Sequence, residues 1–112
     1  MARLASELVV KALIRRVFAE GGIATVLARG EEQAGGILVL TLDRGADPRF
    51  FEAGLGPAGA PELLRAGPAE LADEDAVRDY WQKRRSRDPD LWVVELDIAR
   101  GERFAAEIIL NR

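Results

Sequence analysis

The stretch LWVVELDIARGERFAAEIIL, residues 91–110, decides the expected fold of this chain. Its first half places an apolar side chain at every second residue, namely Trp92, Val94, Leu96 and Ile98. After a turn at residues 100–102, the same period continues through Phe104, Ala106, Ile108 and Leu110. Two period-two segments around a glycine-containing turn predict a C-terminal β-hairpin. The competing interpretation makes residues 102–110 a terminal helix.

Four further strands are expected upstream, over residues 23–29, 36–43, 49–52 and 62–65. Residues 37–40, ILVL, are apolar on both alternating faces, which is typical of a central strand covered on both sides. Residues 54–61, GLGPAGAP, contain too much glycine and proline for regular structure and predict a loop.

Two helices complete the expected set. Residues 4–19 carry one broad apolar face; Ser6 is a candidate N-cap and the glycines at 21 and 22 end the helix. A second helix begins at Asp73 or Asp75 and runs to about residue 86. Its apolar side chains, Val77, Tyr80 and Trp81, are expected to dock on the sheet. The sequence therefore predicts a single α+β domain over residues 1–112, with a largely antiparallel sheet packed by an N-terminal helix and by a second helix before a C-terminal β-hairpin.

The side-chain inventory excludes most catalytic chemistry. The 112 residues include no Cys and no His, which excludes disulfides, thiolate nucleophiles, imidazole bases and the usual zinc sites. No catalytic residue, cofactor or metal is therefore expected, and the protein is not expected to be an enzyme. Charged residues interrupt every apolar run well before the ~18 residues needed to cross a bilayer, so the expected location is the cytoplasm, with no membrane partner.

Two basic clusters stand out although the formal net charge is -3. One comprises Lys11, Arg15 and Arg16, and the other comprises Lys83, Arg84, Arg85 and Arg87. Such clusters can neutralise nucleic-acid phosphates, particularly if they form one surface. The second cluster is better explained as a solvated helix C-terminus, where the helix dipole favours cations.

Four carboxylates near the last strand raise the question of a hard cation: Asp88, Asp90, Glu95 and Asp97. Glu95 and Asp97 share one face of a strand, as a shared magnesium or calcium ion would require. Asp88 and Asp90, however, flank a proline in a turn, where aspartate is common without a ligand. The turn and the solvent face of a hairpin explain these residues better than a metal.

The first helix carries more apolar surface than one sheet face needs, and both faces of the expected hairpin carry some as well. The second helix or the loops can cover this surface, or a homodimer can bury it. Under the second interpretation, the candidate apolar interface comprises Leu8, Val9, Leu13 and Trp92. The expected function is a non-enzymatic protein-interaction module that forms a homodimer or binds another protein. The alternatives are a nucleic-acid or ribonucleoprotein accessory protein that uses the basic helix surfaces, and a small-molecule sensor with a pocket between helix and sheet.

Three segments resemble a small bacterial family, domain of unknown function 1491. They are SELVVKALIRRVFAEGGIATVLARG at 6–30, AGGILV at 34–39 and RDPDLWVVELD at 87–97. The resemblance covers most of the chain in the same order and is weakest over residues 43–73. It implies a cytoplasmic single-domain protein, with no assigned activity, cofactor or catalytic residues to transfer.

Overall fold

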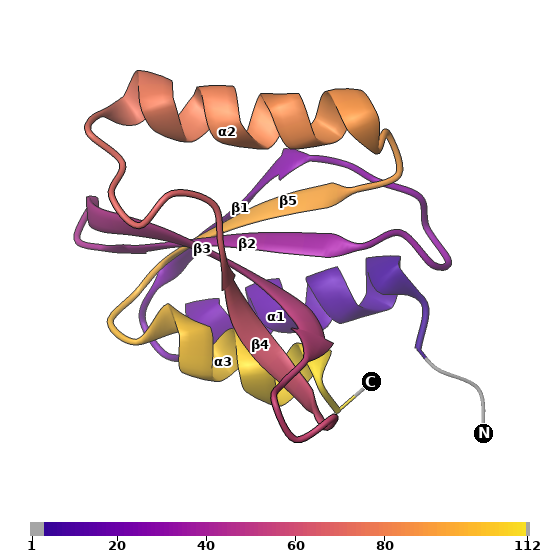
Figure 1. Ribbon diagram of the computed structural model, residues 1–112. Helices are drawn as coiled ribbons and strands as arrows, with labels where there is room; N and C mark the ends of the chain where they lie inside the picture. Colours follow the sequence, from indigo (N-terminus) through magenta and orange to yellow (C-terminus); the bar gives the residue numbers. More distant parts are fainter. Residues whose placement is uncertain (1–3, 112) are drawn as a thin grey trace.

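The computed structural model describes residues 4–111 as one five-stranded sheet with helices on both faces (Figure 1). In chain order the elements are α1 (Ser6–Ala19), β1 (Ile23–Ala28), β2 (Ile37–Asp43), β3 (Ala46–Leu55), β4 (Pro61–Ala66), α2 (Glu74–Arg87), β5 (Trp92–Asp97) and α3 (Gly101–Ile109). The mixed α and β composition and the strands expected upstream of α2 are confirmed, although β3 is longer than the segment 49–52.

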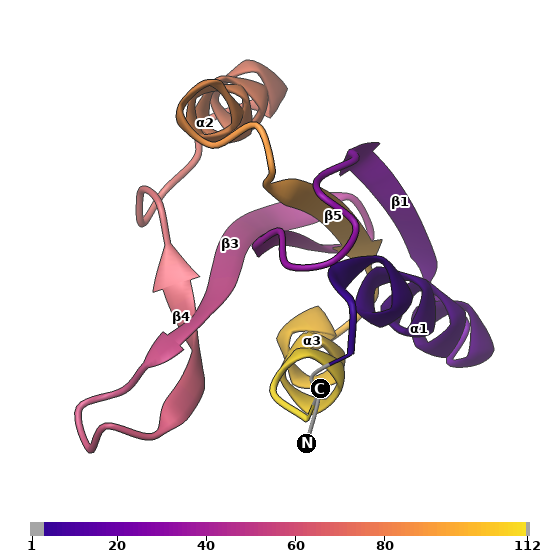
Figure 2. The ribbon, with the colours of Figure 1, turned by 90° about the vertical axis from the view of Figure 1, so that its right-hand side faces the viewer.

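The sheet has the strand order β1-β5-β2-β3-β4, so β1 and β4 form its two edges (Figure 2). Three of the four strand pairs are antiparallel, whereas β2 and β5 are parallel. The sheet is therefore mixed rather than simply antiparallel. Parallel neighbours require a long connection, and here residues 44–91 provide it by forming β3, β4 and α2.

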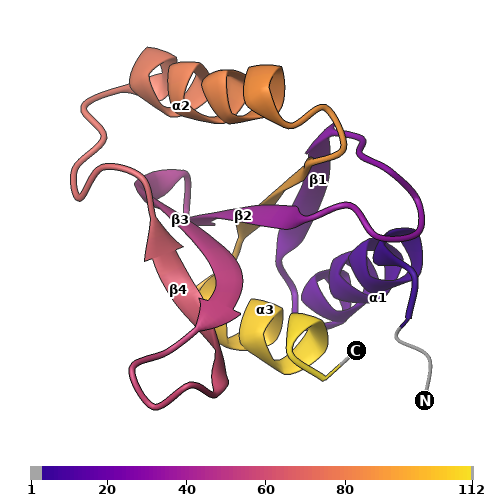
Figure 3. The same cartoon turned by 45° about the vertical axis from the view of Figure 1, so that its right-hand side comes forward.

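Two apolar cores lie on opposite faces of the sheet (Figure 3). On one face, α1 and α3 cover alternate residues of β2 and β5, including Val39, Trp92 and Val94. On the other face, α2 covers the intervening residues, including Leu38 and Val93. The apolar character of residues 37–40 on both sides is thus explained, because β2 is buried on both faces.

The C-terminal hairpin predicted from residues 91–110 is wrong in its second half, where α3 forms instead. The apolar residues of this segment also fit helical spacing, and Gly101, Ala105 and Ile109 are buried at i, i+4 and i+8. The physical reason for the helix is that β5 already has β1 on one side and β2 on the other. No free edge of β5 remains for a hairpin partner, and α3 packs against α1 instead.

The start of α1 also differs from expectation, because Ala5 rather than Ser6 is the N-cap residue. Ser6 is buried, and its hydroxyl donates a hydrogen bond to the carbonyl of Gly35 at 2.6 Å. The backbone amides of Ser6 and Glu7 donate to the carbonyls of Gln33 and Glu32. The loop between β1 and β2 therefore provides acceptors for the helix start that a side-chain cap would otherwise provide.

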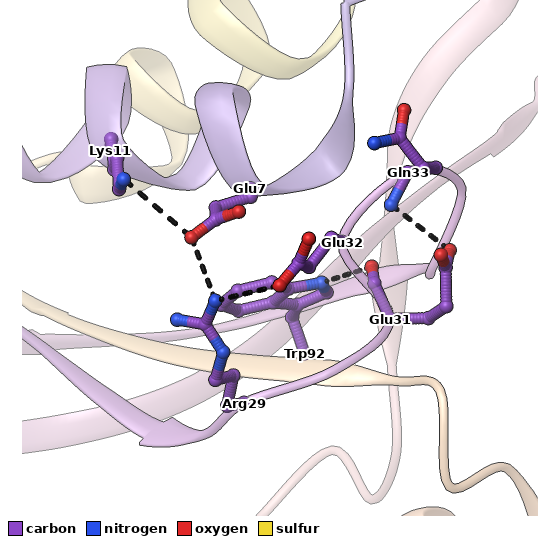
Figure 4. Close-up of polar contacts among 7 residues, drawn as sticks. All are labelled: Glu7, Lys11, Arg29, Glu31, Glu32, Gln33 and Trp92. Carbon is purple, nitrogen blue, oxygen red and sulfur yellow. Dashed lines mark hydrogen bonds and ion pairs between the residues drawn. The ribbon is translucent and has the colours of Figure 1, made fainter.

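Trp92 also contacts the loop between β1 and β2 (Figure 4). The indole Nε1 of Trp92 donates to the carbonyl of Glu31 at 2.8 Å, and the Arg29 guanidinium lies 5.2 Å from the ring centre of the same side chain. The Glu31 carboxylate accepts hydrogen bonds from the amides of Gln33 and Ala34, which lowers the pKa of Glu31. Trp92 therefore joins the core to this loop, and the loop joins β1 to α1.

The backbone at Gly35 approaches the segment before β5 so closely that a side chain does not fit. A Cβ at Gly35 would overlap the carbonyl oxygen of Asp90 and lie 2.8 Å from that of Glu31, both of them backbone atoms. A Cβ at Gly36 would lie at an ordinary 3.4 Å from Leu91. We expect Gly35→Ala to lower the free energy of unfolding by about 1–3 kcal/mol through overpacking. Urea unfolding measures this loss.

The matched control for this experiment is Gly36→Ala, which adds the same methyl group one residue later. We expect its free energy of unfolding to lie within about 0.5 kcal/mol of wild type. Equal losses in the two variants would show that the loop is not held against residue 90 as described.

Candidate interaction surfaces

β1 forms one edge of the sheet and carries few of the features that usually discourage strand pairing. In the described part of the chain its only strand neighbour is β5, so the backbone groups of its outer edge have no partner strand. Its sequence, IATVLA, contains no charged residue and no proline. Ile23 is 60% exposed and Val26 is 38% exposed. An uncharged, apolar edge strand of this kind is a template for pairing with another chain.

Phe18 adds to the apolar surface at this edge. Residues 7, 11, 14 and 18 of α1 follow one side of the helix, because they are three or four positions apart. Glu7 shows which side this is, since its carboxylate accepts a hydrogen bond at 2.7 Å from Arg29, the residue after β1 (Figure 4). Phe18 is therefore on the β1 side of α1, and it is 54% exposed. We call Phe18, Ile23 and Val26 the β1 edge surface.

The opposite edge of the sheet is protected. β4 begins with Pro61 and carries the charged residues Glu62 and Arg65. Proline cannot donate a ladder hydrogen bond, and charges on an edge disfavour association with a second strand. The two edges are thus not equivalent, and the β1 edge is the one suited to accept another strand.

The residues expected from the sequence to form an apolar interface have different positions in the structure. Leu8 is 54% exposed, but Val9, Leu13 and Trp92 are all buried in the core beneath α1. α3, which forms in place of the predicted second hairpin strand, covers part of the apolar surface of α1. An interface that includes Val9, Leu13 and Trp92 is therefore wrong for this fold, since a partner would have to reach side chains already packed against the sheet.

The two basic clusters do not form one surface, because α1 and α2 lie on opposite faces of the sheet (Figure 3). Several of their cations are also bonded within the protein. Lys11 pairs with Glu7, Arg16 with Glu20 and Glu107, and Arg85 donates to the carbonyl of Leu91. Arg15, Lys83 and Arg87 have no such side-chain partner among residues 4–111.

Arg84 has a structural role on the α2 side. Its guanidinium donates two hydrogen bonds to the Glu52 carboxylate, at 2.7 and 3.0 Å, and one to the Tyr80 hydroxyl at 2.9 Å. The bond to Glu52 is the main cause that raises the pKa of Arg84. Tyr80 in turn packs against Phe50, and the centres of the two rings lie 4.7 Å apart. The Arg84–Glu52 and Tyr80–Phe50 contacts hold the C-terminal half of α2 over β3. The Arg84 guanidinium is therefore already bound by groups of the protein itself.

The N-terminal half of α2 leaves a cleft of about 420 Å³ between the helix and the sheet. No residue of α2 is fully buried, and its partly buried residues Val77, Tyr80 and Trp81 pack against the core on this face. Most of the lining is apolar and comes from β1, β2, α2 and the segment before α2, including Leu27, Leu40, Leu42, Leu71, Val77 and Trp81. A volume in this range is typical of small-molecule sites.

Glu95 is the acidic residue of β5 that lines this cleft. It is half-buried, and it forms no ion pair or side-chain hydrogen bond with the described residues 4–111. Burial raises the pKa of Glu95, and the nearby carboxylates of Asp97 and Glu74 raise it further. The cleft therefore contains a carboxylate that ionises less readily than a fully exposed glutamate.

The four carboxylates considered from the sequence do not converge on a cation. The Asp97 carboxylate accepts a hydrogen bond from the amide of Gly45, and the Asp88 carboxylate accepts one from the amide of Asp90. Within the described residues, no group of three or more acidic side chains is arranged to hold a metal ion. Glu95 is thus the half-buried carboxylate of a mostly apolar cleft rather than part of a cation site.

Replacing Glu95 with glutamine removes its titration and keeps its size. The raised pKa means that the folded protein binds this proton more tightly than the unfolded chain, so wild type loses stability as the pH rises above about 4. We expect the melting temperature of Glu95→Gln minus that of wild type to increase between about pH 4 and pH 7. Circular dichroism melts at several pH values measure this difference.

Glu62→Gln is the control, because Glu62 is exposed on β4 and lies outside the cleft. Its melting temperature relative to wild type should stay constant over the same range. A pH-independent difference for Glu95→Gln would contradict the account of Glu95 given above.

Comparison with known proteins assigns the chain to a family. The family model described as "Protein of unknown function (DUF1491)" matches residues 4–106. The crystal structure of a DUF1491 family protein from Caulobacter crescentus is 32% identical, with a TM-score of 0.77 over 91% of this chain and 94% of that one. An NMR structure of a DUF1491 family protein from the same organism gives a TM-score of 0.72 at 32% identity, over 90% and 91% of the two chains.

The solution structure of protein Atu0922 from A. tumefaciens is 33% identical, with a TM-score of 0.65 over 85% of this chain and 86% of that one. No curated protein matches the chain. The helices of residues 4–111 are all too short or too polar to cross a membrane. The family model covers nearly the whole sequence and the relatives share both identity and fold, so the resemblance noted from the sequence is confirmed: the chain belongs to the DUF1491 family, whose function is unknown.

Proposed function

We propose that this protein is a non-enzymatic interaction module that forms a homodimer through β1. The observation that carries the proposal is the β1 edge, which is open, uncharged and apolar while the opposite edge is protected. The proposed location is the cytoplasm, the compartment expected from the sequence. The non-enzymatic part of the proposal is based on the side-chain inventory, which lacks His and Cys.

A second copy of the chain is the partner that fits this edge best. A two-fold axis beside β1 would pair the strand with itself in antiparallel orientation and extend the sheet from five strands to ten. Self-pairing usually fails when like charges lie opposite each other, but β1 has no charged residue. The backbone groups of the outer edge would then gain ladder hydrogen bonds in both copies.

The apolar side chains at the edge support the same arrangement. Ile23 and Val26 project from β1 on opposite faces of the sheet, Val26 on the face that α1 covers, and Phe18 lies on the β1 side of α1. In a symmetric dimer each of these side chains would be repeated across the axis, so the interface would bury apolar surface as well as pair backbone groups. Such a contact removes exposed apolar area from water, which is the main favourable contribution to association.

The nucleic-acid alternative has less support. Its two basic clusters are on opposite faces of the sheet, and Arg84, Arg85 and Arg16 already bond to groups of the protein itself. Phosphate binding by the second cluster would have to compete with those contacts.

Light scattering after size exclusion tests the dimer. We expect wild type to show a mass that rises with concentration toward twice 12.3 kDa. The double variant Ile23→Lys with Val26→Lys should stay monomeric, because self-pairing would place two lysines of like charge on each face of the joined strands. Hydrogen exchange gives a second measurement, and the amides of β1 should exchange more slowly in wild type at high concentration than in the variant.

Leu55→Lys is the matched control, since Leu55 is 70% exposed and lies at the end of β3, far from β1. It should dimerise like wild type. A wild-type protein that remains monomeric at high micromolar concentration would overturn the proposal. So would a double variant that is folded and still dimeric.

A further inference from the structure

We propose that the cleft between α2 and the sheet binds a small organic cation, with an apolar body against the leucines and an ammonium group at Glu95. This site lies on the α2 face of the sheet, and its argument is independent of the dimer proposed through β1. The ligand class is a primary or substituted amine with an aryl or alkyl group.

The apolar walls of the cleft define the body of the ligand. Leu27, Leu40 and Leu42 form the sheet side, and Val77 and Trp81 form the α2 side. A volume of about 420 Å³ accommodates an aromatic ring with a short side chain. Trp81 also lines the cleft, and an indole ring attracts an organic cation more strongly than a neutral group.

The charges around the cleft define the polar end of the ligand. The lining includes three carboxylates, those of Glu95, Asp73 and Glu74, against one cation, Arg78. Arg78 is already hydrogen-bonded to Asp75, and Asp73 caps α2 by accepting from the amide of Ala76 at 2.8 Å. Glu74 and Glu95 have no ion pair or side-chain hydrogen bond among residues 4–111, and Glu95 is the half-buried one of the two, whereas Glu74 is exposed. An anion would meet net repulsion, whereas an ammonium group would meet an unpaired acceptor.

The position of Glu95 also favours an organic cation over a metal ion. A hard cation needs several converging oxygen ligands, and the described residues offer no such group here. A single carboxylate beside leucine side chains can instead form one charge-assisted hydrogen bond to an ammonium group. Binding would also compensate the cost of keeping this carboxylate ionised in the cleft, so ligand and proton should compete.

Three probes of similar shape test the ligand class: 2-phenylethylammonium, 2-phenylethanol and 3-phenylpropionate. The readout is the amide and indole spectrum of ¹⁵N-labelled protein, in which the two tryptophans give separate signals. Trp81 lines the cleft, whereas Trp92 is buried in the core on the other face and serves as an internal control. We expect the ammonium probe to shift the Trp81 signal with Kd at or below about 1 mM and to leave Trp92 unchanged.

The alcohol should bind about tenfold or more weakly, because it cannot form the charge-assisted bond, and the carboxylate probe weaker still. If the alcohol or the carboxylate binds as well as the ammonium probe, the cleft takes a neutral or anionic ligand and the proposal is wrong. Equal shifts at Trp92 would show non-specific binding and would also overturn it.

The variant Glu95→Gln tests the residue. It should weaken binding of 2-phenylethylammonium by about tenfold or more, whereas Glu62→Gln, which changes the net charge equally outside the cleft, should bind like wild type. Equal affinities of the two variants would remove Glu95 from the site and overturn the proposal. The comparison of the three probes on wild type does not depend on either variant and remains decisive if one of them fails to fold.

Discussion

The parallel pairing of β2 with β5 is the constraint on which the rest of the structure depends. β2 is apolar on both faces, and β5 is apolar on one face and carries the buried Val93 on the other, so each face of this pair must be covered. Parallel strands cannot be joined by a tight turn, and the long connection between them carries α2 to one face. α1 and α3 cover the other face, and they occupy it so completely that Val9, Leu13 and Trp92 are core residues rather than interface residues.

The same constraint determines where the two candidate binding surfaces are. β5 pairs with β2 on one side and with β1 on the other. β1 has no further neighbour among the described strands, so its outer edge is open. α2 arrives on the second face by a long connection and is held there at its C-terminal half by Arg84, Glu52 and Tyr80. A cleft remains between its N-terminal half and the leucines of the sheet, and Glu95 lines this cleft.

The β1 edge and the cleft differ in the interactions that would hold a partner. At β1, backbone hydrogen bonds and exposed apolar side chains favour another strand, and the absence of charge favours a copy of the same strand. In the cleft, one half-buried carboxylate among apolar side chains favours a small cation. The basic clusters, which are more conspicuous in the sequence, are divided between opposite faces and partly bonded within the protein.

The sequence by itself determined the local features: the central character of residues 37–40, the two helices before β5, the docking of Val77, Tyr80 and Trp81, and the family. Each of these depends on periodicity, capping or motif over a short range. Only the tertiary structure decided that residues 101–109 form a helix, because alternation and helical spacing coexist there and the choice depends on whether β5 has a free edge. The open β1 edge and the cleft at Glu95 were beyond the sequence for the same reason, since strand order and the distance of α2 from the sheet are set by contacts between residues far apart in the chain.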